Sequence, residues 1–176
     1  MLELRPIDQT SYDDLVQMYK ESFSGFPWFE DLSHSEVEAR VSKHMGQRGF
    51  AGILGSVDNE PVGASWWNTP TLAELAEEKG PEVARFATSY AHHHLVWERE
   101  LLVRPRYQGR GYSLPLRKAF LASLELGRTL VLTRMRDDNV GTLKTGEAVG
   151  FRPTSIVTPS KKEGAFHRVY YLLVER

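Results

Sequence analysis

The stretch that decides the fold runs from Leu95 to Leu126 and reads LVWERELLVRPRYQGRGYSLPLRKAFLASLEL. Its first part is hydrophobic, as in a buried strand, and its last part has apolar residues at helical spacing. A short basic loop containing Gly109 and Gly111 joins the two parts. The stretch therefore predicts a strand, a tight loop and a helix in direct succession.

This loop has the properties of an anion-binding site. Its glycines let the backbone turn sharply and approach a ligand, and the helix behind it presents main-chain N–H groups without intrahelical partners. Those groups, the positive end of the helix and the guanidinium groups of Arg104, Arg106 and Arg110 favour an anion, and diphosphate is the natural candidate. The residues of a P-loop are absent, and Leu114 occupies the place of the third glycine in a dinucleotide fingerprint.

The strand and loop resemble the acyl-CoA-binding segment of the GNAT superfamily of N-acyltransferases. Its signature, Gln/Arg-x-x-Gly-x-Gly/Ala, follows a strand that ends in Val-x-Pro. The matching residues here are Val103-Arg104-Pro105 and Gln108-Gly109-Arg110-Gly111-Tyr112-Ser113. Ser113 departs from the signature, because it replaces glycine or alanine with another small residue. The alternative interpretation is a strand-to-helix turn that binds no ligand.

The resemblance implies that acetyl-CoA is the co-substrate and that main-chain N–H groups from Gln108 to Ser113 hold its diphosphate. It further implies that the backbones of Leu102 and Val103 polarise the thioester carbonyl, and that Asn139 opens a helix beside the pantetheine arm. The implied fold is α/β, a GNAT-type mixed central β-sheet with helices on both faces. We expect residues 1–176 to form a single domain.

Composition excludes several classes of protein. The formal net charge of −1 gives no electrostatic signal for nucleic acid or an anionic membrane. The absence of cysteine excludes disulfides, thiolate metal sites and a cysteine nucleophile. No apolar run approaches the length of a membrane span, and the first ten residues lack signal-peptide features. We expect a cytoplasmic protein, and we predict no metal site because the consecutive residues His92 to His94 would alternate between strand faces.

The rest of the chain predicts short strands that alternate with helices. The turn residues Asp58-Asn59 indicate an antiparallel hairpin, and Asp8 or Ser11 can cap the first helix. The expected strands cover residues 2–7, 50–57, 61–67, 129–135, 151–158 and 168–174. The expected helices cover residues 15–19, a segment from the capping box Ser33/Glu36 to Gly46, two short segments within 71–91, a segment ending at Gly127, and 140–148.

Two segments are candidates for contact with the acceptor substrate. The segment from Glu21 to Asp31 is rich in aromatic residues and is broken by glycine and proline, so it either lines a pocket or is a loop pinned to the core. The segment from Thr71 to Ala91 is rich in glutamate and follows two tryptophans, so it would either attract a cationic amine or form a solvated helix face. The substrate candidates are Phe26, Trp28, Trp66 and Glu74.

The predicted chemistry needs a base, because an amine attacks a thioester only when it is neutral. In GNAT proteins the usual base is a glutamate on the central strand, which makes Glu98 the first candidate here and Glu100 the second. Their spacing places both on the same side of the strand. The alternative is an ion pair of either glutamate with Arg99 or Arg134. Many GNAT members have a tyrosine as general acid where this chain has Gly146, so the usual acid is missing.

The sequence therefore predicts an N-acetyltransferase that moves the acetyl group of acetyl-CoA to a primary amine by direct attack. A small cationic amine is favoured as acceptor, with a protein amine as an alternative. A different class, a non-catalytic CoA-binding sensor or sequestering module, is motivated by Gly146. The last strands are candidates for pairing across a homodimer.

Overall fold

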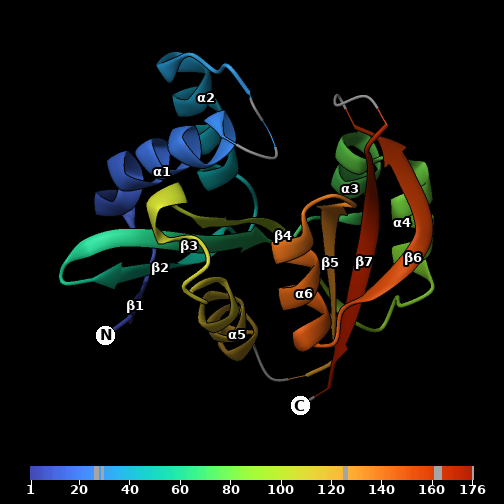
Figure 1. The fold of residues 1–176 in the computed structure, drawn as a ribbon. Helices are drawn as coiled ribbons and strands as arrows, with labels where there is room; N and C mark the ends of the chain where they lie inside the picture. The colour runs from blue at the N-terminus through green and yellow to red at the C-terminus, as the bar shows by residue number, and fades with distance from the viewer. Residues whose placement is uncertain (26–27, 29, 125–126, 161–163, 176) are drawn as a thin grey trace. The chain divides into compact units, whose positions relative to one another are not determined.

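The computed structural model describes residues 1–25, 28, 30–124, 127–160 and 164–175 (Figure 1). Its strands are β1 (Glu3–Pro6), β2 (Ala51–Val57), β3 (Glu60–Asn68), β4 (His94–Val103), β5 (Thr129–Arg136), β6 (Arg152–Pro159) and β7 (Phe166–Val174). Its helices are α1 (Tyr12–Ser24), α2 (His34–Met45), α3 (Leu72–Lys79), α4 (Pro81–Thr88), α5 (Ser113–Ser123) and α6 (Val140–Ala148). Two short 3-10 helices, η1 (Gln9–Ser11) and η2 (Pro105–Tyr107), precede α1 and α5.

The described strands form a mixed seven-stranded sheet in the order β1-β2-β3-β4-β5-β7-β6. Strands β4 and β5 are parallel, with a register that runs from His94–Thr129 to Glu98–Thr133. The pairs β1–β2, β5–β7 and β6–β7 are antiparallel. The predicted α/β class with a mixed sheet is therefore confirmed. The position of β7 between β5 and β6 was not predicted, because strand order depends on tertiary pairing.

Contacts within the chain divide it into two compact units. Unit 1 contains Met1–Trp66 and Glu100–Ser123, and unit 2 contains Trp67–Arg99 and Leu124–Arg176. Strand β4 contributes to both, because the boundary falls between Arg99 and Glu100. Whether residues 1–176 fold as a single domain stays a prediction.

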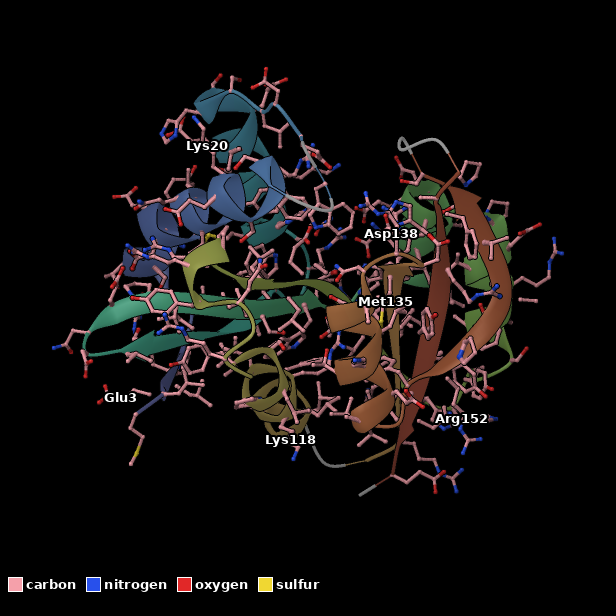
Figure 2. All side chains as sticks on the ribbon, in the orientation of Figure 1. Glu3, Lys20, Lys118, Met135, Asp138 and Arg152 are labelled. Carbon is pink, nitrogen blue, oxygen red and sulfur yellow. The ribbon has the colours of Figure 1, made fainter. Side chains whose placement is uncertain are left out.

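Unit 1 has helices on both faces of its strands (Figure 1). On one face α1 and α2 pack their apolar residues on Leu54, Ala64 and Trp66. On the other face, Leu116 of α5 lies against the glycines at 55 and 63. Burial of each large aliphatic side chain in such a core contributes about 1.5–3 kcal/mol. The exposed ends of Lys20 on α1 and Lys118 on α5 lie outside this core (Figure 2).

The local turn and cap predictions in unit 1 are largely confirmed. Asp58 and Asn59 have positive φ angles of 51° and 63°, as a tight hairpin turn requires. Ser33 and Glu36 form the predicted capping box of α2. Of the two predicted caps for the first helix, Asp8 caps η1, whereas Ser11 is the N-cap residue of α1 but makes no capping hydrogen bond through its side chain. The prediction that Gly127 ends the next helix was wrong, because α5 already ends at Ser123.

Unit 2 packs α3 and α4 on its strands. The core contains Leu75 from α3, Val83 and Ala87 from α4, and side chains of β4, β5 and β7, among them Trp97 and Leu132. The two short helices predicted within 71–91 are thereby confirmed. Within the described ranges, no helix has both the length and the apolar character that crossing a membrane would require.

Candidate active site

The loop after β4 leads through η2 into α5, which begins at Ser113. Gly109 and Gly111 have φ angles of 74° and 83°, in the left-handed region that favours glycine. Apart from the glycine itself and its two neighbours in the chain, no described atom lies within 4 Å of the place where a Cβ would be added at either residue. The backbone conformation therefore requires these glycines, and the space beside them is open and exposed.

Gln108 fixes this loop to the end of the strand. Its side-chain Nε2 donates a hydrogen bond to the main-chain oxygen of Val103 at 3.0 Å. Leu102 belongs to the core of unit 1 with only 4% of its surface exposed. Tyr112 and Ser113 are half-buried where α5 begins. The loop thus leaves a rigid strand and enters the first turn of α5, where the first N–H groups of a helix lack intrahelical acceptors.

Of the three arginines expected to converge on this loop, two form ion pairs with acidic side chains. Arg104 is buried and forms ion pairs with Glu21 at 3.5 Å and with Glu60 at 3.6 Å. Arg106 also pairs with Glu60. Arg110 is exposed, and its guanidinium carbon lies 5.2 Å from the ring centre of Tyr107. Anion binding at this loop would therefore depend on main-chain amides and Arg110.

Glu100, on β4, lies at one end of a polar network in unit 1. The hydroxyl of Tyr19, on α1, donates a hydrogen bond to Glu100 Oε1 at 3.3 Å. Arg40 Nη1, on α2, donates to the same hydroxyl at 3.1 Å and to Glu30 Oε2 at 3.2 Å. Burial raises the pKa of Tyr19 above its ordinary value, and the negative charge of Glu100 raises it further. Tyr19 is therefore a neutral donor.

The other candidate base, Glu98, lies on the part of β4 that belongs to unit 2 and is only 1% exposed. Its neighbour Arg99 donates hydrogen bonds to Asn68 Oδ1 at 2.8 Å and to Glu78 Oε1 at 2.6 Å. Burial raises the pKa of Glu78, but the hydrogen bond from Arg99 and the charges of Lys79 and Arg99 outweigh this and lower it to about 2. Arg99 thus serves as the partner of an α3 glutamate.

The predicted substrate residues have different environments. Phe26 lies outside the described residues. Trp28 is partly buried, with its ring centre 5.1 Å from that of Phe23. Trp66 is 1% exposed, and its indole N–H donates to His44 Nδ1 at 3.3 Å. Glu74 belongs to unit 2, where its carboxylate accepts a hydrogen bond from the main-chain N–H of Thr71 at 2.6 Å in a capping box.

Sequence reasoning missed the polar residues of α1 and α2 in this network. Neither Tyr19 nor His44 was selected from the sequence. His44 is 8% exposed and packs in the core. Its spacing after Val37 and Val41 follows the buried face of α2 and could have indicated this.

Unit 2 contributes the helix that follows β5. Asn139 is its N-cap, and the side-chain Oδ1 accepts a hydrogen bond from the main-chain N–H of Thr142 at 3.3 Å. Before this cap, Arg136 Nε donates a hydrogen bond to Asp138 Oδ1 at 2.6 Å. Figure 2 labels Asp138 and Met135 of β5. Gly146 is buried within α6. The described residues contain no group of three metal-ligating side chains that could hold an ion.

Comparison with solved structures identifies the fold. The chain resembles a GNAT-family acetyltransferase of Bacillus cereus, with a TM-score of 0.67, 14% identity, and coverage of 100% of this chain and 99% of that one. It also resembles the ribosomal-protein-S18-alanine N-acetyltransferase of Escherichia coli, with a TM-score of 0.70, 13% identity, and coverage of 100% and 96%. A third match is yncA of Salmonella typhimurium, solved with its cofactor acetyl-CoA, with a TM-score of 0.70, 12% identity, and coverage of 100% and 95%.

The chain therefore has the fold of the GNAT acetyltransferases, which confirms the fold implied by the sequence. Neither a protein-family model nor a curated protein matches the sequence.

Proposed function

We propose that this protein is an N-acetyltransferase that transfers the acetyl group of acetyl-CoA to a primary amine. The observation that carries the proposal is the loop of Gln108–Ser113, with its left-handed glycines and open space, at the start of a helix within a GNAT fold. A generic turn does not need two such glycines with nothing packed beside them. The yncA structure with acetyl-CoA, which shares the fold, supports the choice of co-substrate.

The residues of the loop fit a diphosphate. Main-chain N–H groups of Gly109 to Ser113 would bind its oxygens, whereas the expected contribution of the Gln108 N–H is wrong, because that group donates to the main-chain oxygen of Pro105 at 3.2 Å. Arg110 would add one positive charge, and the Gln108 side chain would keep the loop on β4. The backbones of Leu102 and Val103 would orient the thioester, and Asn139 would contact the pantetheine arm. Acetyl-CoA supplies the activated acyl group. The chain's own residues supply positioning and proton transfer.

Proton transfer is assigned to a carboxylate on β4. A lysine-like amine with a pKa of about 10.4 costs about 4–5 kcal/mol to deprotonate at pH 7, so a nearby base accelerates attack. Glu98 and Glu100 are both candidates. We assign Glu100 as the base that accepts the proton of the amine. Glu100 is only half-buried and receives a hydrogen bond from Tyr19, whereas Glu98 is 1% exposed. An acceptor amine reaches a half-buried carboxylate more readily.

No tyrosine stands at the usual position of the general acid, which is Gly146. A thiol of pKa near 8.5 leaves as a thiolate with only modest help, so the reaction does not depend on this acid. The same glycine favours the second candidate function, a non-catalytic module that binds CoA.

The acceptor is assigned as a small cationic amine. The support is Trp28, which follows α1 and packs on Phe23 of that helix, whose ring stacks on Tyr19 of the Tyr19–Glu100 network. Trp66 and Glu74, the other two described substrate candidates, would support acceptor binding only indirectly. Trp66 is a core residue, and Glu74 is part of the cap of α3. A protein amine is the alternative acceptor, and the name of the Escherichia coli relative, an alanine N-acetyltransferase of a ribosomal protein, supports it.

The decisive experiment measures thiol release from acetyl-CoA with polyamines, aminoglycosides and peptides that carry a free α-amino group. We expect turnover with at least one amine, and a decrease in kcat of about 100-fold or more for Glu100→Gln. Glu98→Gln should reduce kcat less. Glu3→Gln, an exposed change on β1, serves as the control and should retain wild-type kcat. CoA binding without turnover on any amine would establish the non-catalytic module instead.

A further inference from the structure

Tyr19 is the buried residue through which the polar network of α1 and α2 reaches β4. Only 2% of its surface is exposed, yet its hydroxyl has two partners, Glu100 at 3.3 Å and Arg40 at 3.1 Å. Arg40 in turn bonds Glu30 at 3.2 Å. The four side chains therefore form one chain of hydrogen bonds, Glu30–Arg40–Tyr19–Glu100, within unit 1.

The direction of these hydrogen bonds is fixed by chemistry. A guanidinium group has donors only, so Arg40 must donate to the Tyr19 oxygen. The phenol keeps its proton, because burial and the charge of Glu100 raise the pKa of Tyr19. That proton has one remaining acceptor in the chain of bonds, the carboxylate of Glu100. Arg40 thus orients the Tyr19 hydroxyl toward β4.

The ring that carries this hydroxyl is held in place by its neighbours. It stacks on Phe23 with a centroid distance of 4.3 Å and an interplanar angle of 20°. The ring of Trp66 lies 6.3 Å away, that of His44 lies 6.4 Å away, and the Arg40 guanidinium lies 5.6 Å from the ring centre. Because these groups restrict rotation, the hydroxyl is a preorganised donor.

We propose that Tyr19, oriented by Arg40, is a positioning residue that holds the Glu100 carboxylate in the orientation in which it accepts the proton of the acceptor amine. This inference rests on the proposed function with Glu100 as base. The titratable and charged groups around Tyr19 are Glu100, Arg40, Glu30 and His44. Tyr19 itself exchanges no proton with the substrate.

The test removes only the hydroxyl, with Tyr19→Phe. We expect kcat/KM for the amine to fall about tenfold, because one hydrogen bond to a charged group is lost. The acidic limb of the pH profile of kcat/KM should move up by about one pH unit, since a donated hydrogen bond favours the ionised carboxylate. In a Glu100→Gln background the same change should have no further effect on kcat/KM, because Tyr19 acts through Glu100.

Tyr12→Phe is the matched control. Tyr12 is on the same helix, and its hydroxyl bonds the Glu38 main-chain oxygen at 3.2 Å and Ser42 Oγ at 2.8 Å, both on α2. Removal of the Tyr12 hydroxyl should weaken the contact between α1 and α2 but should leave the pH profile of kcat/KM unchanged. Arg40→Met should act like Tyr19→Phe, whereas Arg40→Lys, which keeps a charged donor, should restore part of kcat/KM. If Tyr19→Phe does not fold, the comparison of Arg40→Met with Arg40→Lys still tests the proposal.

The possible failures can be told apart. A wild-type enzyme that releases no thiol with any amine overturns the proposed function and the inference with it. An active wild type with an unchanged acidic limb in Tyr19→Phe overturns the inference alone. So does a tenfold loss that persists in the Glu100→Gln background.

Discussion

The ion pair between Glu78 and Arg99 gives unit 2 a stability that depends on pH. Burial raises the pKa of Glu78, but its hydrogen bond from Arg99 and nearby positive charges lower it from 4.5 to about 2. Because the folded-state pKa is depressed, the stabilisation is present above the unfolded-state value and is lost as the pH falls through the folded-state value. The loss should therefore occur between about pH 4.5 and 2.

We predict that Glu78→Gln lowers the free energy of unfolding at pH 7 by about 2 kcal/mol, because the buried guanidinium of Arg99 loses its charged partner. The difference from wild type should shrink as the pH approaches 2. Urea unfolding at pH 7, 4 and 3 measures both effects. Glu77→Gln, an exposed neighbour on α3, should change little at any pH. A difference that stays constant down to pH 3 would contradict the prediction.

Single residues also show why part of the site escaped sequence reasoning. The loop glycines and Gln108 were identified because their spacing carries a backbone requirement that is local. The ion pairs of Arg104 and Arg106 were not predicted, because their shared partner, Glu60, is more than 40 positions away in the sequence and no periodicity connects them. Tyr19 and His44 were missed as polar groups for the same reason, since both bond residues on other elements.

At the scale of elements, the contact between α5 and the sheet depends on Gly63 of β3. A Cβ there would lie 2.6 Å from the main-chain oxygen of Leu102 and 2.9 Å from Leu116 Cδ1. Because the closest atom belongs to a backbone, it cannot move aside easily. We predict that Gly63→Ala lowers the free energy of unfolding by about 2–3 kcal/mol in urea titrations. Gly25→Ala, which has open space and a negative φ, should change it far less.

The start of α6 gives a second prediction at this scale. Asn139 caps the helix through Thr142, so Asn139→Ala should lower the free energy of unfolding by about 1 kcal/mol, whereas Asn139→Asp should retain the cap. Thermal unfolding monitored by circular dichroism compares the two variants. If Asn139→Ala melted at the same temperature as Asn139→Asp, the cap would contribute nothing to the stability of the fold.

Most helices and strands were predictable because their signals are local. Capping boxes at Ser33 and Thr71, the Asp58-Asn59 turn and the apolar spacing of α1 each act within a few residues. The Ser33 box, the turn and the apolar spacing of the first helix were used in advance, but the Thr71 box was not. Glu74 was instead taken as a substrate residue, although its spacing from Thr71 carries the same capping signal.

At the scale of the whole molecule, CoA should stabilise the folded chain. Saturation at about 100 times Kd adds about 2.7 kcal/mol, which raises the Tm by roughly 5–10 °C for a chain of this size. Gly111→Ala should abolish most of this rise, because alanine is strained at a φ of 83°. Gly164→Ala, at a φ of 75° with equally open space in another loop, bears the same strain and should show the full rise. A full rise in Gly111→Ala would contradict the role of the loop.

Strand order is the property of the whole molecule that the sequence predicted least. The resemblance implied a mixed sheet, and the sheet is mixed. The placement of β7 between β5 and β6 also requires β7 to pair with β5, from which α6 and β6 separate it in the chain. Hydrophobic pattern specifies which face of a strand is buried but not which strand lies beside it.

The division of the chain also constrains its synthesis. Unit 1 takes its residues from before Trp67 and after Arg99, so a nascent chain that has emerged only as far as Trp66 lacks β4 and α5. Translation of the intervening stretch takes several seconds at about 5–20 residues per second. During that delay the apolar face that α5 later covers is open to the solvent, and this is the interval in which a ribosome-associated chaperone would have its strongest effect on yield.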